Sequence, residues 1–281
     1  MVVESKPSPA AAPVVLSNRQ LLVIVALFPL AFVIVALMLD SPRGLLEGLG
    51  RIVTSRDTLI TDYMGVGGIG AALLNAGLLT LAALLFYWRT GAVIGGASVA
   101  CLFLVLGFAL FGKSLLHAWS IVLGVYLYTL YKKEPFAKHI NVAFFGAALA
   151  PIFSEIFFST ALPLHVSAPL AVGTTLLLGF VLVPTAAHLF KTHMGFTLYT
   201  FCFVAGLLGT LVVAIYKSYG FVPDPVFIWT SGNNRLLGSL LFGLFATMAA
   251  GAFWIDHGVW RQQLALMRRS GQSPTDFVAH H

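Results

Sequence analysis

The chain has 281 residues, of which 59% are hydrophobic and only 9% are charged, and its mean hydropathy is +0.93. This composition excludes a soluble globular domain and indicates an all-α, polytopic membrane helix bundle. The apolar runs are continuous for about 20 residues, whereas a membrane β-barrel would show short segments of alternating polarity. The formal net charge of +6 does not indicate nucleic-acid binding, because the basic residues sit at the ends of apolar runs and in loops. We expect these residues to contact the headgroups of a lipid bilayer.

The chain divides into a tail, a membrane domain and a second tail. Residues 1–17 are rich in proline and alanine and are expected to be disordered. A transmembrane helical domain is expected over 18–258, and a basic C-terminal tail over 259–281. Within the domain, apolar runs predict about eight spans: 21–39, 61–88, 93–111, 114–131, 140–160, 168–190, 195–216 and 236–255.

Residues 40–60 predict an amphipathic helix rather than a span. Asp40 or Ser41 can cap it, with Pro42 at its first position. Five apolar residues then fall on one face: Leu45, Leu46, Leu49, Ile52 and Val53. Such a helix either lies in the membrane interface or docks under the bundle, and its pattern is the same in both cases.

The stretch from Thr61 to Trp88 combines features that a plain span does not need. Glycines cluster where it begins, including Gly67, Gly68 and Gly70, and an amide, Asn75, interrupts the apolar run that follows. One interpretation is a small-residue face against which another helix packs, with Asn75 bonding between helices. The other is a broken or re-entrant half-helix that faces a solute, as in many transporters.

An internal repeat is the second hypothesis for this region. The segment from Gly70 can be aligned with the segment from Gly195, which pairs Leu73 with Leu198 and Asn75 with Thr200. Duplicated halves of transporters show repeated hydropathy of this kind.

Three ionisable residues lie within or beside apolar runs, where charges are costly. Lys113 and His117 are four residues apart and would share a helix face. Glu155 follows Pro151 in an apolar span and needs a cation, a wet cavity or a proton. We predict that Glu155 pairs with Lys113 or His117, as a structural tie or as a gate. Lys113 near an interface and Glu155 near the headgroups are the plainer alternatives.

No metal, cofactor or enzyme motif is expected. The sequence has no HExxH or GxSxG motif, and Cys101 and Cys202 lie within apolar runs without further ligands. A membrane enzyme that uses His117 and Glu155 remains a third interpretation.

The distribution of basic residues predicts the orientation. With the N-terminus in the cytoplasm, ten basic residues lie inside and six outside, so both termini are expected to be cytoplasmic.

Three phrases carry a family resemblance: TSRDTLITDYMGVGGIGAALLNAGLL, FGKSLLHAWSIVLGVYLY and HINVAFFGAALAPIFSEI. They resemble the bacterial membrane proteins catalogued as domain of unknown function 1576, from about Ser55 to the C-terminus. The resemblance implies a multi-pass protein of the bacterial cytoplasmic (inner) membrane, without an activity or site residues. Proteins of this kind tend to continue past the DFVA segment, so we expect this chain to be a fragment or a short form that assembles with other subunits.

The sequence therefore predicts a membrane channel or secondary transporter for a small polar, uncharged solute, and not an enzyme. Few embedded charges argue for a neutral solute. The expected lining residues are Gly67, Gly68, Gly70, Asn75, Thr200 and Glu155. The alternative is a structural or assembly subunit, a homo-oligomer or partner of a membrane complex, that packs through small-residue faces such as Gly243, Thr247 and Gly251.

Overall fold

The computed structural model describes residues 16–58, 60–159, 162–193, 200–222 and 227–267. Regular structure within these ranges is helical, apart from two isolated β-bridges. Six helices are long and apolar enough to cross a membrane, at Asn18–Leu39, Ile69–Thr90, Ile140–Phe157, Leu164–Lys191, Thr200–Ser218 and Asn234–Ile255. The predicted all-helical class is confirmed, and several helices fit a multi-pass membrane protein. Most of the two predicted tails, 1–15 and 268–281, lies outside the described residues.

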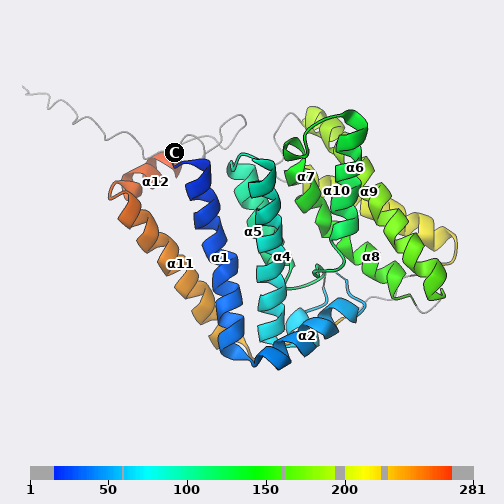
Figure 1. Cartoon of the computed structure of the whole chain (residues 1–281), viewed down its shortest axis with the longest axis horizontal. Coiled ribbons are helices and arrows are strands. Elements are labelled where there is room, and N and C mark those ends of the chain that lie inside the picture. The colour runs from blue at the N-terminus through cyan, green and yellow to red at the C-terminus, as the bar shows by residue number, and fades with distance from the viewer. Residues whose placement is uncertain (1–15, 59, 160–161, 194–199, 223–226, 268–281) are drawn as a thin grey trace, which may run out of the picture.

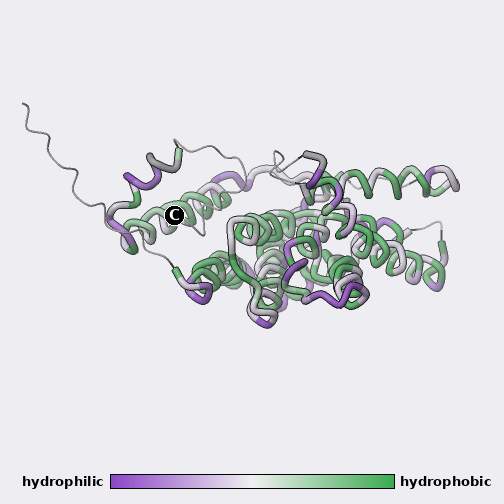
Figure 2. The backbone as a smooth tube through the Cα atoms, turned by 90° about the horizontal axis from the view of Figure 1, so that it is seen from above, coloured by the Kyte–Doolittle hydropathy of each residue, from purple (hydrophilic) through white to green (hydrophobic). Residues whose placement is uncertain are grey.

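The helices form two groups (Figure 1). One group contains α1 (Asn18–Leu39), α4 (Ile69–Thr90), α5 (Gly96–Phe108) and α11 (Asn234–Ile255). The other contains α6 (Trp119–Lys132), α7 (Ile140–Gly146), α8 (Ala150–Phe157), α9 (Leu164–His193) and α10 (Thr200–Ser218). The short helices α2 (Pro42–Thr54) and α3 (Tyr63–Gly67) lie across one end, which we call the α2 end, and α12 (Val259–Met267) lies at the other. Hydrophobic residues dominate the long helices, as expected for helices that face lipid (Figure 2).

A continuous apolar core joins the two groups. It includes Leu79 of α4, Leu102 of α5, Ile121 of α6, Phe144 of α7 and Leu182 of α9, all at most 2% exposed. Helices α6 and α9 approach each other closely, because a Cβ atom on Gly124 would lie 2.1 Å from the carbonyl oxygen of Leu176. Small residues allow this backbone contact between membrane helices.

Two of the predicted spans are shorter than expected. The runs 93–111 and 114–131 correspond to α5 and α6, which have 13 and 14 residues. At 1.5 Å per residue each is about 20 Å long, against about 30 Å for a bilayer core. Residues 109–118 between them, here called the hairpin loop, contain no α-helix, and Gly112 has a φ of 64°. Among the described residues six helices are long enough to span a membrane and this pair is shorter, so the predicted count of about eight spans is not confirmed.

Helix α2 forms as its sequence predicts, and it docks against the bundle. The Ser41 side chain accepts a hydrogen bond from Gly44 N, and Pro42 opens the helix. Gly48 meets Gly67 at the α3–α4 junction, where a Cβ on Gly48 would lie 2.3 Å from the Gly67 carbonyl oxygen. Leu46, expected on the buried face, is instead 68% exposed. The helix ends at Thr54, and the described residues that follow it in the predicted 40–60 segment, 55–58 and 60, are not helical.

Candidate functional site

The glycine-rich stretch contains a helix break. Asp62 caps α3 by accepting a hydrogen bond from Met64 N at 2.9 Å, and α3 ends after five residues. Gly68 then has a φ of 94°, a conformation that residues with a side chain rarely adopt, and α4 begins at Ile69. The break that the second sequence interpretation requires therefore lies at Gly68.

The neighbouring glycines make close helix contacts, as the first interpretation expects. A Cβ on Gly67 would lie 2.7 Å from Gly48 O of α2, and one on Gly70 would lie 2.9 Å from Leu45 Cδ2. Gly67 and Gly70 are buried. Their positions fit a docking surface for α2, while Gly68 is exposed at the break.

Asn75 bonds α4 to the hairpin loop. Its Nδ2 donates to the carbonyl oxygens of Ala109 at 2.6 Å and Lys113 at 3.1 Å. Its Oδ1 accepts from Leu115 N at 3.0 Å. The side chain is fully buried, so these bonds replace the solvation that the loop backbone has lost. Asn75 thus bonds two segments together, as the first interpretation expects, but its partners belong to a loop and not to a second helix.

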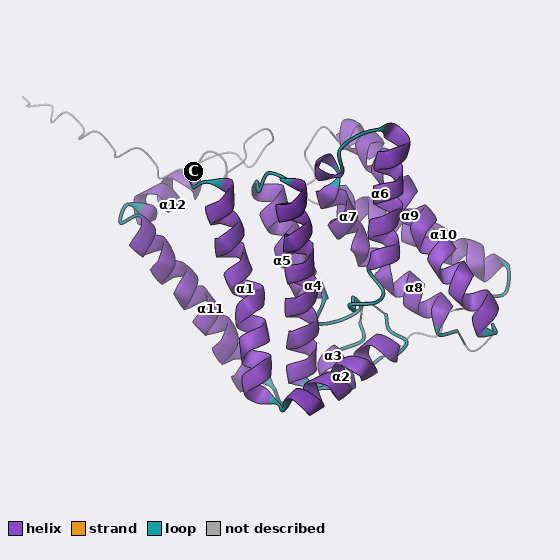
Figure 3. Cartoon of the chain, viewed as in Figure 1, coloured by secondary structure: helices purple, strands orange, loops and turns teal. Residues whose placement is uncertain are grey.

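A buried polar cluster lies beside the hairpin loop. It consists of Asp57, Tyr63, His117 and Ser154, together with the pair Arg56 and Glu155, and we call it the polar cluster. The non-helical segments that carry several of these residues gather between α3 and α8 (Figure 3). Asp57 comes from the α2–α3 loop, Tyr63 from α3, His117 from the hairpin loop and Ser154 from α8. Three segments distant in sequence therefore meet at one site: residues 56–63, the hairpin loop and α8.

Asp57 is the centre of the polar cluster. Tyr63 Oη donates to Asp57 Oδ2, and His117 Nδ1 lies 3.3 Å from the same oxygen. The Asp57 backbone N–H donates to Ser154 Oγ at 2.9 Å. Asp57 and His117 are both fully buried, and Asp57 Oδ1 has no hydrogen-bond partner among the described residues. Burial, reinforced by the Asp57 carboxylate, raises the pKa of the Tyr63 phenol well above its ordinary value, so Tyr63 acts as a hydrogen-bond donor.

The structure corrects the predicted partners of Glu155, His117 and Lys113. Arg56 Nε lies 3.7 Å from Glu155 Oε2, and His117 pairs with Asp57. Lys113 is 2% exposed, its ammonium lies 5.5 Å from the centre of the Phe108 ring, and no carboxylate forms an ion pair with it in the described part of the chain. The predicted ion pair of Glu155 with Lys113 or His117 is therefore wrong, although Glu155 and His117 do belong to one cluster.

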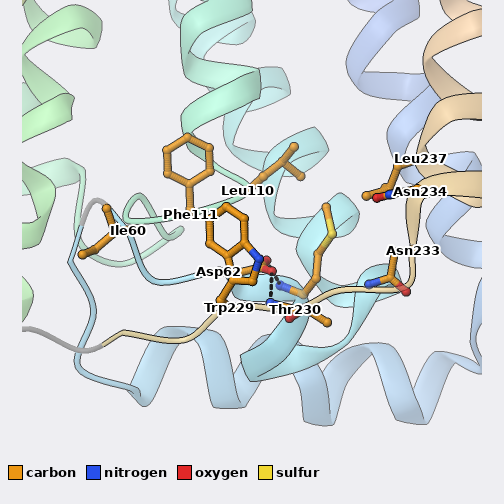
Figure 4. Close-up of a pocket in the computed structure, with 10 residues that line it drawn as sticks. Ile60, Asp62, Leu110, Phe111, Trp229, Thr230, Asn233, Asn234 and Leu237 are labelled. Atoms are coloured by element: carbon orange, nitrogen blue, oxygen red, sulfur yellow. Dashed lines mark hydrogen bonds between the residues drawn. The ribbon is translucent and has the colours of Figure 1, made fainter.

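A pocket of about 480 Å³ lies on the other side of the α3 segment (Figure 4). Its lining is Ile60, Asp62, Met64, Leu110, Phe111, Trp229, Thr230, Asn233, Asn234 and Leu237, and we call it the α11 pocket. The lining is mainly apolar, with amides at the start of α11 facing the Asp62 side. Thr230 N donates to Asp62 Oδ2 at 3.1 Å, while Thr230 Oγ1 is buried without a hydrogen-bond partner among the described residues.

The α11 pocket and the polar cluster share a wall. Asp62 lines the pocket, and the next residue, Tyr63, reaches Asp57. Leu110 of the hairpin loop also lines the pocket and accepts a hydrogen bond from Tyr63 N at 3.1 Å, while His117 of the same loop belongs to the cluster. A movement of the hairpin loop would therefore change both sites.

Thr200 and the predicted repeat do not join this site. Thr200 is buried at the start of α10, beside Phe201, whose ring stacks on Phe145 of α7 at 5.4 Å. Its proposed repeat partner, Asn75, lies inside α4. Gly195 and Leu198, the other members of the repeat, lie outside the described residues, and the repeat stays a prediction.

Asp57 and Arg56 are the residues that sequence reasoning missed. Both follow an amphipathic helix, where charged residues are usually solvated. The signal that was present is the sequence SRDTLITDY itself, which places Arg56, Asp57 and Tyr63 directly before a glycine-rich break. Opposite charges in such a segment are candidates for pairing with embedded groups such as Glu155 and His117.

The fold and the site define a class of protein: a helical protein with several helices long and apolar enough to cross a membrane, and with buried ionisable groups where helices are interrupted. The chain belongs to the family described as "Protein of unknown function (DUF1576)", whose family model matches residues 41–218. The match covers α2 to α10, and it therefore includes the whole polar cluster. No curated protein and no solved structure matches the chain.

Proposed function

We propose that this protein is a channel or secondary transporter for a small, uncharged solute. The observation that carries the proposal is the polar cluster. Fully buried ionisable side chains, Asp57 and His117, meet where several helices are interrupted. Embedded charges are expensive and usually mark a pathway, and discontinuous helices form the binding sites of many secondary transporters.

The α11 pocket is the proposed solute site. Its volume of about 480 Å³ falls in the range of small-molecule sites, about 300 to 1,000 Å³. The polar groups that it offers are the Thr230 hydroxyl and the amides of Asn233 and Asn234. Asp62 already accepts hydrogen bonds with both carboxylate oxygens, which favours an uncharged solute. The predicted lining residues Gly67, Gly70 and Asn75 are not part of the pocket lining. Gly67 and Gly70 contact α2, and Asn75 bonds to the hairpin loop, which does line the pocket.

Solute flux into proteoliposomes tests this proposal. The purified protein is reconstituted, and light scattering follows the uptake of urea, glycerol and small neutral amides. We expect Leu237→Trp, which fills the α11 pocket, to reduce the flux at least tenfold. Leu241→Trp is the matched control, because Leu241 lies one turn along the same helix, is 50% exposed and does not line the pocket. Equal flux in both variants, or none above empty liposomes for any solute, would contradict the proposal.

A structural or assembly subunit is the second candidate. Helix α11 contains no buried residue in the single chain, and the surroundings of Gly243 and Gly251 are open. Lipid or a partner helix would cover this face, and small residues suit a close partner. In that case the protein would co-purify with a stoichiometric membrane partner and would show no flux.

We further propose that the protein resides in the cytoplasmic membrane of a bacterium with both termini inside. The start of α1 and the end of α11 lie at the same end of the bundle (Figure 1), which supports a shared side for the termini. If α5 and α6 form a re-entrant pair, as their length suggests, every basic residue except Lys113 keeps the side predicted for it, and Lys113 is buried between the two helices. Ten basic residues against the remaining five then still favour the cytoplasm for that end.

A further inference from the structure

The Asp57–His117 pair has an unusual proton requirement. His117 Nε2 lies 3.2 Å from the carbonyl oxygen of Val53. A carbonyl oxygen only accepts, so a bond here requires the proton on Nε2. In a neutral imidazole Nδ1 then carries a lone pair, and this lone pair lies 3.3 Å from the Asp57 carboxylate. Two acceptors so close in a buried site repel each other unless one of them binds a proton.

The charges of the polar cluster point the same way. The guanidinium of Arg56 and the carboxylate of Glu155 form one pair, which is neutral in sum. Asp57 and a neutral His117 together carry a charge of −1, and one additional proton removes it. The other ionisable group in contact is Tyr63, which already donates to Asp57 Oδ2. Lys113, which belongs to the same hairpin loop as His117, directs its ammonium toward the Phe108 ring.

The Ser114 hydroxyl accepts a hydrogen bond from the His117 backbone N–H at 3.4 Å, and two aromatic rings contact the His117 imidazole. The ring of Phe153 stacks on the imidazole at 5.6 Å, and that of Phe158 lies edge-on at 5.8 Å. These rings can neither supply nor accept the missing proton. An uncompensated charge in such surroundings is costly. Asp57 and His117 are therefore favoured with one shared proton, because the pair then has no net charge.

We propose that Asp57 and His117 form a binding site for one proton, and that H⁺ is the coupling ion of the transporter. The second half of this inference rests on the function proposed above. On binding, one O–H bond of hydronium breaks, water is left, and the proton lies between Nδ1 and the carboxylate. On release the proton returns to water and hydronium forms again.

The position of the pair connects proton occupancy to the α11 pocket. His117 belongs to the hairpin loop, which contributes Leu110 and Phe111 to the pocket, and Asp57 belongs to the segment that contributes Ile60 and Asp62. The proton holds these two segments together, since its loss leaves a lone pair against a carboxylate. Release would therefore favour separation of the two walls of the pocket.

Proton occupancy is measurable without a solute. Histidine ¹⁵N NMR on the protein in nanodiscs distinguishes the imidazolium from neutral imidazole, and infrared difference spectroscopy detects a protonated carboxyl group. At a pH of about 8.5 an ordinary histidine is neutral. We expect either an imidazolium signal that His117→Gln removes or a carboxyl band that Asp57→Asn removes.

Two further variants assign the signals. His139→Gln identifies the signal of His139, which pairs with Glu134 and would otherwise be confused with that of His117. His165→Gln is a matched control at an exposed position of α9. The wild-type protein alone shows whether an imidazolium signal or a protonated carboxyl band is present. The test therefore still holds if one of the variants fails to fold. A neutral His117 with an ionised Asp57 throughout would overturn the proton site.

Flux measurements separate this inference from the proposed function. A solute flux that depends on the pH gradient, and loses this dependence in Asp57→Asn, supports H⁺ coupling. A wild-type flux that is indifferent to the gradient overturns the coupling and leaves the transporter proposal intact. Absence of any flux contradicts the proposed function, and the NMR result then still decides whether the proton site exists.

Discussion

Replacement of Asn75 by alanine should open the hairpin loop. The substitution removes three buried hydrogen bonds, to Ala109 O, Lys113 O and Leu115 N. Side-chain hydrogen bonds in membrane proteins contribute about 0.6 to 1.7 kcal/mol each, so we expect a loss of about 2 to 5 kcal/mol. Ala109 ends α5, and no further turn of helix is available to satisfy its carbonyl oxygen.

The assay is unfolding of the purified protein in mixed micelles, followed by circular dichroism. Thr80→Ala is the matched control on the same helix, since Thr80 is 1% exposed and its hydroxyl bonds only to Ala76 O within α4. We expect the control to change the free energy of unfolding by less than about 1 kcal/mol. If Asn75→Ala were no less stable than Thr80→Ala, the amide would not be what holds the loop.

Two other predictions test the docking of α2 and the ion pairs that follow α6. Gly48→Ala should destabilise the protein by about 1 to 3 kcal/mol, because the new Cβ would lie 2.3 Å from Gly67 O. Gly50→Ala is the control on the same helix, and it should be neutral or slightly stabilising, because its Cβ would meet nothing within 4 Å. Equal effects of the two substitutions in thermal unfolding would contradict the docking of α2. Hydrogen bonds from Lys138 and then from His139 lower the pKa of Glu134 to about 2, so the stabilisation by this carboxylate should be present above its ordinary value of 4.5 and be lost as the pH falls through about 2. Lys138→Ala should move the Glu134 titration, measured by ¹³C NMR, toward 4.5, and an unchanged midpoint would contradict the assignment.

Sequence patterns predicted those features that depend on local residues. The cap at Ser41, the amphipathic helix that follows, and a break among the glycines all follow from the short-range chemistry of turns and helix ends. Asn75 also stood out, since an amide in an apolar run needs a partner. Its partners could not be predicted, because they are backbone groups about 35 residues away that become available only where α5 ends.

The length of α5 and α6 shows why hydropathy alone does not determine the number of spans. Residues 93–131 are apolar throughout, apart from a few positions near Gly112 and Lys113, so their hydropathy resembles that of two full spans. The difference depends on Asn75, which stabilises ten residues of non-helical backbone that would otherwise be too costly in the bundle. The partner of Glu155 was missed for a similar reason, since Arg56 reaches it only through tertiary packing.

The hairpin loop is held at its two ends by different kinds of interaction. Asn75 binds residues 109–115 through neutral hydrogen bonds, which do not depend on pH. His117, near the other end, is joined to Asp57 by a contact that is attractive only with one proton present. The first end can therefore act as a fixed anchor while the second responds to protons. Accordingly, Asn75→Ala should lower stability equally at all pH values, whereas Asp57→Asn should change how stability depends on pH, and the reverse pattern would contradict this division of roles.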